Sequence, residues 1–257
     1  MAHWSAYPYA GEFKFDAASV KRKWSRLHAG DLEPLPDDPQ VLQVWADYHN
    51  GLFHQATKAA LKLGLKAMNV AHKASCMYAR YLEPHEACRL DLFLGVAERA
   101  QAQMHEQPDN LNAAYWHAFA LGHYCQGLSV AKALGQGLDA RVKAGLESVI
   151  RRQPEHADAH VVLGSFHAGV IDKVGSLIGA MAYGVNKDIG LTLFARALAL
   201  NDQAAFPALE QARALLKLGG DDLREQARQH YQVAAGVQPA DATEHLEVEL
   251  ARRELAA

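Results

Sequence analysis

Apolar positions along the chain follow the period of helices rather than that of strands. Alternation of apolar and polar residues never persists beyond a few positions, and Ala, Leu, Gln, Glu, Lys and Arg dominate nearly everywhere. One spacing recurs near three predicted helix ends: a large apolar residue, a smaller one three positions later, and a helix-stopping residue five positions after that. Its occurrences are Leu146, Val149 and Pro154; Phe194, Ala197 and Asp202; and Tyr231, Ala234 and Pro239. We therefore predict an all-α protein that buries the large residues of this pattern.

Caps, prolines and glycines divide the chain into the predicted helices. Asp16 suits an N-cap, Pro39 suits the first position of a helix, and Gly64 suits a helix stop. The proline-rich segment Leu32–Asp38 predicts a linker. These signals predict helices over 17–29, 39–50, a stretch ending at Leu63, 66–82, 84–106, 109–127, 138–153, 155–169, 186–201, 207–218, 222–237 and 241–256. The domains expected are an N-terminal arm, helix and linker over 1–38 and a helical repeat domain over 39–257.

Two of the predicted helices share a signature, Leu121-Gly122 to Gly127 and Leu163-Gly164 to Gly169. Each is followed by an apolar, glycine-containing insert, residues 128–137 and 170–184. The inserts lengthen two repeat units beyond the about 34 residues of a plain helix-turn-helix repeat. Because both are too apolar for solvated loops, we expect two short helices tucked against the array. Gly122 and Gly164 are expected where paired helices approach most closely.

The repeating pattern resembles the tetratricopeptide class of helical repeats. Gly51-x-Phe53-x-x-Ala56 and Ala227-x-x-x-Tyr231-x-x-Ala234-x-x-x-x-Pro239 are the fragments that carry the resemblance. The insert-bearing units are similar to a branch that contains the T component associated with TRAP-type transporters and the regulator-of-microtubule-dynamics proteins. The resemblance covers residues 40–257 and implies a right-handed α-solenoid of paired antiparallel helices with insert helices. It also implies a non-enzymatic, sometimes oligomeric protein whose repeats line a groove or pore.

The resemblance has one departure. Transporter-associated members of the branch are typically exported lipoproteins, whereas the start of this chain shows neither an export signal nor a lipid-acceptor cysteine. This puts the transporter role in doubt for this protein.

Composition narrows the classes of function. A net charge of -3 and a pI near 6.5, without a basic run, do not fit a nucleic-acid binder. Cys76, Cys88 and Cys125 are odd in number and widely spaced, which favours a reducing compartment over a disulfide framework. The most apolar stretch, 174–185, is shorter than the about 20 residues of a spanning helix. We expect a cytoplasmic protein without a membrane span.

The resemblance also predicts a binding surface, because the first helix of each tetratricopeptide pair lines the concave side. Counted from the shared signature, the partner-binding residues expected there are Trp116, Phe119, His123 and Gln126 in one unit and Asp158 and Ser165 in the next. Lys132 and Lys173 occupy related positions in the two inserts, where they would meet an anionic group. A register shifted by one residue would instead send Trp116 into the core.

Catalytic motifs are missing from the sequence, including the Gly-x-Ser-x-Gly elbow and the phosphate-binding loop. His156, His160 and His167 share a helix face, but the residues between the first two lack the Glu of zinc hydrolases. We therefore predict no catalytic residue, no metal and no cofactor, with a metal-dependent hydrolase kept as a minor alternative.

The predicted function is that of a scaffold or adaptor that engages a protein or peptide through its concave face. The main alternative is a small-molecule-binding module with a pocket between the inserts and the helix that carries Trp116. Homo-oligomerisation is compatible with both.

Overall fold

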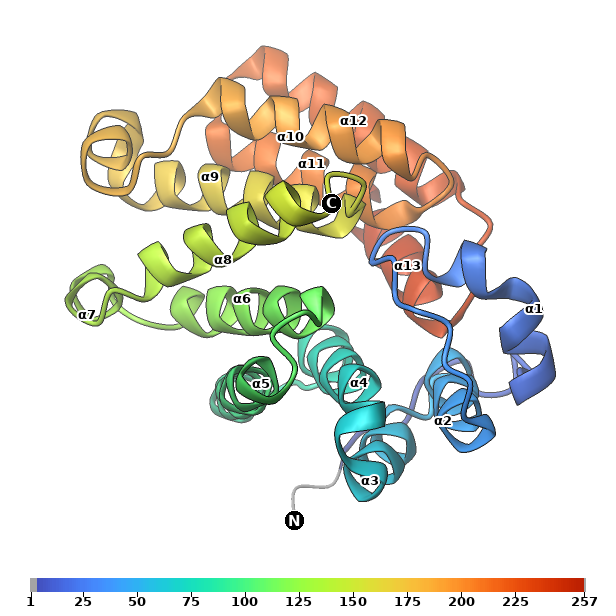
Figure 1. Cartoon of the computed structure of the whole chain (residues 1–257). Coiled ribbons are helices and arrows are strands. Elements are labelled where there is room, and N and C mark those ends of the chain that lie inside the picture. The colour runs from blue at the N-terminus through green and yellow to red at the C-terminus, as the bar shows by residue number, and fades with distance from the viewer. Residues whose placement is uncertain (1–3, 257) are drawn as a thin grey trace. The chain divides into compact units, whose positions relative to one another are not determined.

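The computed structural model describes residues 4–256, and all regular structure within that range is helical, without a strand (Figure 1). This confirms the all-α prediction. The described chain divides into two compact units. Unit 1 contains residues 4–28, 33–138 and 240–243, and unit 2 contains residues 29–32, 139–239 and 244–256.

The elements follow one another along the chain, most of them with short connections. They are α1 (Ala17–Leu27), α2 (Pro39–His49), α3 (Phe53–Leu63), the 3-10 turn η1 (Gly64–Ala67), α4 (Met68–Tyr81), α5 (Glu86–Glu106), α6 (Leu111–Gln126), α7 (Val130–Gly135), α8 (Leu138–Arg152), α9 (Ala157–Ile178), the π turn η2 (Gly179–Tyr183), α10 (Lys187–Leu200), α11 (Ala205–Leu218), α12 (Asp221–Gly236) and α13 (Ala242–Ala256).

Local signals account for where several helices begin. Asp16 caps α1 through a capping box, in which its carboxylate accepts from the Ser19 N–H at 2.7 Å and its own N–H donates to Ser19 Oγ at 2.8 Å. Asp38 caps α2, and Pro39 occupies the first helical position. The predicted N-cap at Asp16 and the predicted helix start at Pro39 are confirmed.

In unit 1 successive helices pack against each other from α1 to α6, and α2, α4 and α6 also contact one another in turn. Gly51 makes the turn from α2 to α3 with a φ of 82°, and a Cβ added there would lie 2.6 Å from the Tyr7 ring. The spaces between the helices are filled by fully buried aromatic side chains, among them Trp45, Tyr48 and Tyr78. Three helices of this unit, α2, α4 and α6, thus form one continuous row.

In unit 2, α9 packs on α10 and α11 packs on α12. Helix α9 also packs on α11. Gly164 is a point of close approach, because a Cβ added there would lie 2.9 Å from Phe194 Cε2 and 3.1 Å from the Gly190 carbonyl oxygen. Phe194 is buried, as predicted from its place in the recurring spacing.

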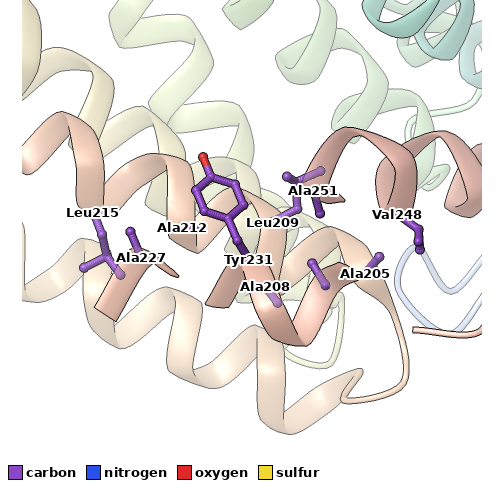
Figure 2. Close-up of a cluster of buried hydrophobic side chains, with 10 residues drawn as sticks. Ala205, Ala208, Leu209, Ala212, Leu215, Ala227, Tyr231, Val248 and Ala251 are labelled. Atoms are coloured by element: carbon purple, nitrogen blue, oxygen red, sulfur yellow. The ribbon is translucent and has the colours of Figure 1, made fainter. Parts of the chain in front are cut away.

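The core between α11, α12 and α13 combines small and large residues (Figure 2). Alanines at 205, 208, 212, 227, 234 and 251 keep the helices close, and Leu209 and Leu215 fill the remaining space. Tyr231, which the sequence places in the core, is 4 % exposed and belongs to this cluster. The pattern of large and small residues thus matches a packed helical interface.

The second insert differs from its prediction. Helix α9 runs on to Ile178 instead of ending at 169, because the apolar residues that follow continue the helix until Gly175 interrupts it with a φ of 80°. Neither insert is tucked in: Ala133 of the first and Val170 and Gly179 of the second are buried, but most of the other apolar side chains are exposed. Their apolar character therefore does not reflect burial within their own units.

Candidate functional site

A row of polar and aromatic side chains lies on α2, α4 and α6 of unit 1, under the N-terminal part of the chain. We call this row the covered face. It consists of Trp45, Tyr48, His49, Asn69, Lys73 and Asn112, and each of these residues is at most 8 % exposed. The residues 33–38, which we call the strap, lead from the end of unit 2's short segment 29–32 to the start of α2. The strap and α1 supply the groups that meet the covered face.

The Glu33 carboxylate is the centre of the polar contacts. Asn69 Nδ2 donates to both of its oxygens at 3.0 Å, and Asn112 Nδ2 donates to Oε2 at 2.6 Å. The Glu33 backbone carbonyl accepts from Trp24 Nε1 at 2.8 Å. A carboxylate from an extended segment is thus held by two amides that come from two neighbouring helices.

A second layer of amides fixes the direction of Asn69. Gln103 Nε2 donates to Asn69 Oδ1 at 3.1 Å, so the Asn69 NH₂ group turns toward Glu33. Gln103 is 2 % exposed, and its Oε1 lies 3.0 Å from His72 Nε2. Burial lowers the pKa of His72 to about 3, so the ring is neutral and donates from Nε2 to this amide oxygen. The amide that faces the carboxylate is therefore held in one orientation by its surroundings.

The two amides occupy the same place in their helices. Asn69 is the second residue of α4 and Asn112 is the second residue of α6, so both lie in a first turn. The N-terminus of a helix carries partial positive charge and unpaired N–H groups, which favour an anion nearby. The site thus offers one carboxylate two amide donors, each from the first turn of a helix.

An aromatic cluster continues the covered face beside this site. Trp24 of α1 meets Trp45 edge to face at a centroid distance of 5.6 Å, and His28 meets Trp45 at 4.6 Å. Lys73 Nζ lies 5.9 Å from the Trp45 centroid and 5.6 Å from that of Tyr48, within cation–π range. The face therefore combines ring surfaces with oriented polar groups.

The C-terminal segment 240–243 contacts the same face within unit 1. His49 Nδ1 lies 2.7 Å from Asp241 Oδ2, and the Tyr48 hydroxyl lies 2.7 Å from Thr243 Oγ1. These contacts join residues far apart in the sequence and close one side of the aromatic cluster.

The five residues of unit 1 that the sequence predicted to bind a partner lie in different surroundings. Trp116 and Phe119 are 2 % and 1 % exposed, as the register shifted by one residue implies for Trp116. His123 is half-buried and stacks on Phe93 at 4.8 Å, while Gln126 is exposed at the end of α6. Lys132 is exposed on α7. The structure does not bring these five side chains together on one surface of unit 1.

The residues expected in the next repeat lie in unit 2. Asp158 is half-buried in the first turn of α9, where its N–H donates to the Gly30 carbonyl at 3.0 Å. Lys173 is exposed. Burial raises the pKa of Asp139, and the positive charge of Lys173 counteracts part of this rise. Ser165 is half-buried and donates to Glu210 Oε2 at 3.5 Å.

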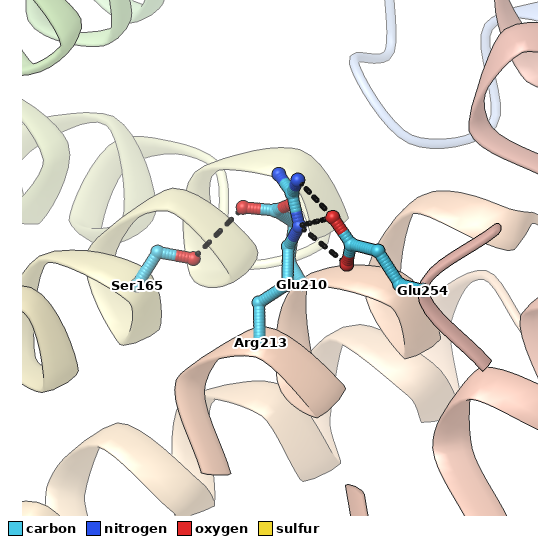
Figure 3. Close-up of polar contacts among 4 residues, drawn as sticks. All are labelled: Ser165, Glu210, Arg213 and Glu254. Atoms are coloured by element: carbon cyan, nitrogen blue, oxygen red, sulfur yellow. Dashed lines mark hydrogen bonds and ion pairs between the residues drawn. The ribbon is translucent and has the colours of Figure 1, made fainter. Parts of the chain in front are cut away.

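Ser165 adjoins an ionic cluster (Figure 3). Arg213 Nε donates to both oxygens of Glu254, at 3.1 and 3.0 Å, and Arg213 Nη1 contacts Glu210 Oε1 at 3.5 Å. Burial opposes ionisation of Glu254, but hydrogen bonds from Arg213 and Tyr231 outweigh it and hold the pKa of Glu254 below its usual value. Burial and the hydrogen bond to Glu254 raise the pKa of Tyr231. The cluster ties α9, α11, α12 and α13 together.

The histidines considered for a metal make backbone contacts instead. His156 Nδ1 accepts from the Ala159 N–H at 3.1 Å, His160 Nε2 lies 3.0 Å from the Pro154 carbonyl, and His167 Nδ1 accepts from the Asn186 N–H at 2.9 Å. Within residues 4–256, no group of three or more His, Cys, Asp or Glu side chains is placed to hold a metal ion. Burial raises the pKa of the Cys76 thiol, which makes it a poor nucleophile.

No protein-family model matches the chain, and no curated protein matches it. Among the described residues, one helical stretch, Ala157–Tyr183, is long and apolar enough to cross a membrane by length and composition alone. A single stretch of this kind is weak evidence of a membrane span, because core helices of soluble proteins pass the same test.

The sequence prediction missed the residues that make the covered face a site. It interpreted Leu32–Asp38 only as a linker and gave Asn69 and Asn112 no role. A usable signal was present, since each asparagine lies close to the predicted start of a helix, the position from which its amide can meet an anion.

Proposed function

We propose that this protein is a non-catalytic binding protein and that its covered face takes an extended, acidic segment of a partner protein. The observation that carries the proposal is the Glu33 carboxylate, which is held by Asn69 and Asn112 from equivalent positions of α4 and α6. The chain's own strap occupies the place that the partner's segment would take.

The strap has the features of a bound peptide. Pro34 and Pro36 favour an extended backbone, and Pro34 and Leu35 are exposed, so the contacts of Glu33 at one end and Asp38 at the other hold this part of the chain. Such segments lose little conformational entropy when they bind. At its far end Asp38 is anchored by Lys66, 2.6 Å away. A partner with an acidic residue flanked by prolines would match the same features.

The strap is also attached under strain. Leu32, directly before it, has a φ of 47°, a left-handed conformation that costs a non-glycine residue about 1–2 kcal/mol. Release of the strap would relieve this cost. This relief offsets part of the free energy lost when a partner's carboxylate displaces Glu33.

Protein or peptide binding is better supported than the pocket alternative. That alternative needs Trp116 and Phe119 to face a ligand, whereas both are buried among neighbouring side chains such as Tyr115. The covered face, in contrast, already holds a segment of polypeptide.

The test measures binding of a peptide in trans. A fluorescein-labelled peptide of residues 32–38 is titrated with the full-length wild-type protein and with Glu33→Ala, and fluorescence anisotropy is recorded. We expect Glu33→Ala to bind about tenfold more tightly than wild type, because the internal competitor loses its charge-assisted hydrogen bonds. The same peptide with glutamine at the position of Glu33 should bind Glu33→Ala about tenfold more weakly.

Asp37→Ala is the matched control, since it removes a carboxylate of the strap that is exposed. It should behave as wild type. If Glu33→Ala keeps its helical circular dichroism but binds neither peptide, Glu33 is a structural clamp and the proposed function is wrong.

A further inference from the structure

Unit 2 ends in an apolar tip, which we define by Leu177, Ile178 and Met181. Their exposed fractions are 75 %, 56 % and 82 %, and those of Leu177 and Met181 are the two highest among the exposed large apolar residues. The tip lies at the end of α9 and in η2, which form a projecting loop of unit 2 in Figure 1. Exposure of three neighbouring large apolar side chains is unfavourable in water, so the tip needs an explanation outside the core.

The chain around the tip forms an uncharged segment with a lysine at each end. Residues 174–186 contain no Asp, Glu, Lys or Arg. The nearest charged residue is a lysine on both sides, Lys173 before and Lys187 after, and both are exposed. Tyr183, half-buried, lies at the C-terminal end of the tip. Apolar residues bordered by lysine and tyrosine match the layers of a membrane surface, with acyl chains inside and phosphates outside.

The helix that carries the tip is not a fully buried core helix. Only 33 % of the most apolar window in Ala157–Tyr183 is buried. The buried residues, such as Val161 and Leu163, lie in its first half, where α9 packs on α10 and α11. The folded unit therefore leaves the second half of this apolar stretch available while its first half stays in the core.

We propose that the apolar tip inserts into the interfacial layer of a lipid bilayer, with Lys173 and Lys187 at the level of the headgroup phosphates. Between Val174 and Gly184 the only polar side chains are those of Ser176 and Tyr183, so the segment offers a protein partner few hydrogen-bonding side chains. Asp172 lies next to Lys173 and Asp188 lies next to Lys187, each one position further from the tip along the sequence. Apolar insertion therefore contributes more than net charge, and the affinity should depend only moderately on anionic lipid.

Vesicle flotation with the full-length protein tests the proposal. Vesicles of phosphatidylcholine, with and without phosphatidylserine, are floated with wild type, with Leu177→Ser/Met181→Ser and with Leu216→Ser/Val233→Ser. The last variant is the matched control, because it removes two exposed apolar side chains of unit 2 away from the tip. We expect wild type and the control to float, and the tip variant to partition about tenfold less for each side chain lost.

Three results would overturn the proposal: no flotation of wild type, equal flotation of the tip variant, or equal loss in the control. Light scattering without vesicles separates a further case. If wild type is a dimer, the tip variant is a monomer and neither floats, the tip contacts a second copy of the chain instead of lipid. None of these results depends on peptide binding at the covered face, so the two proposals stand or fall separately.

Discussion

Replacement of Gly164 by alanine should destabilise unit 2, although alanine is the better helix former. A Cβ at this position would lie 2.9 and 3.0 Å from two carbons of the Phe194 ring and 3.1 Å from the Gly190 carbonyl oxygen. The favourable separation of non-bonded carbons is about 3.5–4.0 Å, so the ring would have to move by about 0.5–1 Å. Phe194 is 1 % exposed, and the Gly190 carbonyl belongs to the backbone of α10, so neither can move freely.

The magnitude follows from two opposed effects. Overpacking of this kind costs about 1–3 kcal/mol, whereas glycine to alanine in a helix interior gains about 1 kcal/mol. Gly169 lies in the same helix with no atom within 4 Å of an added Cβ, so Gly169→Ala should show the helix gain alone. We expect Gly164→Ala to be about 1–3 kcal/mol less stable than Gly169→Ala.

Urea unfolding followed by circular dichroism measures both free energies of unfolding. Addition of Phe194→Leu to each variant tests the source of the difference in stability. The smaller side chain should restore part of the free energy of unfolding that Gly164→Ala loses, but it should restore none in Gly169→Ala. Equal stability of the two glycine variants would refute the close approach of α9 and α10 at this point.

Two further predictions concern buried titratable groups. Tyr231→Ala should lower the free energy of unfolding by about 3–5 kcal/mol through a cavity among α11, α12 and α13, whereas Tyr231→Phe should cost about 1–2 kcal/mol through loss of the hydrogen bond to Glu254. Thermal melts in which the two variants are equal would show that the ring does not fill the core. The pKa of His72 is about 3 in the folded protein and 6.5 in the unfolded chain. The contribution of the neutral ring to the free energy of unfolding is therefore complete above pH 6.5 and is lost as the pH falls toward 3. Urea unfolding between pH 7 and pH 4 should show stability falling with a slope of at most about 1.4 kcal/mol per pH unit from this group, and an unchanged slope in His72→Gln would contradict the assignment.

Much of the helical architecture could be predicted from the sequence because its signals are local. Caps such as Asp16, prolines such as Pro39 and the period of apolar residues act within one or two turns, so they specify helices wherever these finally pack. The buried positions of Phe194 and Tyr231 followed from the same periodicity, because a large residue on the apolar stripe has no other favourable place.

The candidate site depended on the path of the chain. Glu33 meets Asn69 and Asn112, which are 36 and 79 positions away, and nothing local to any of the three requires the contact. The rotation of α6 that buries Trp116 is likewise decided by its neighbours, since a helix with apolar residues on most of its circumference has no unique inward face. The second insert was predicted as buried because it is apolar, yet Leu177 and Met181 are exposed. Hydrophobicity determines the free energy of a side chain in water, but only the packing of the other elements decides whether anything covers it.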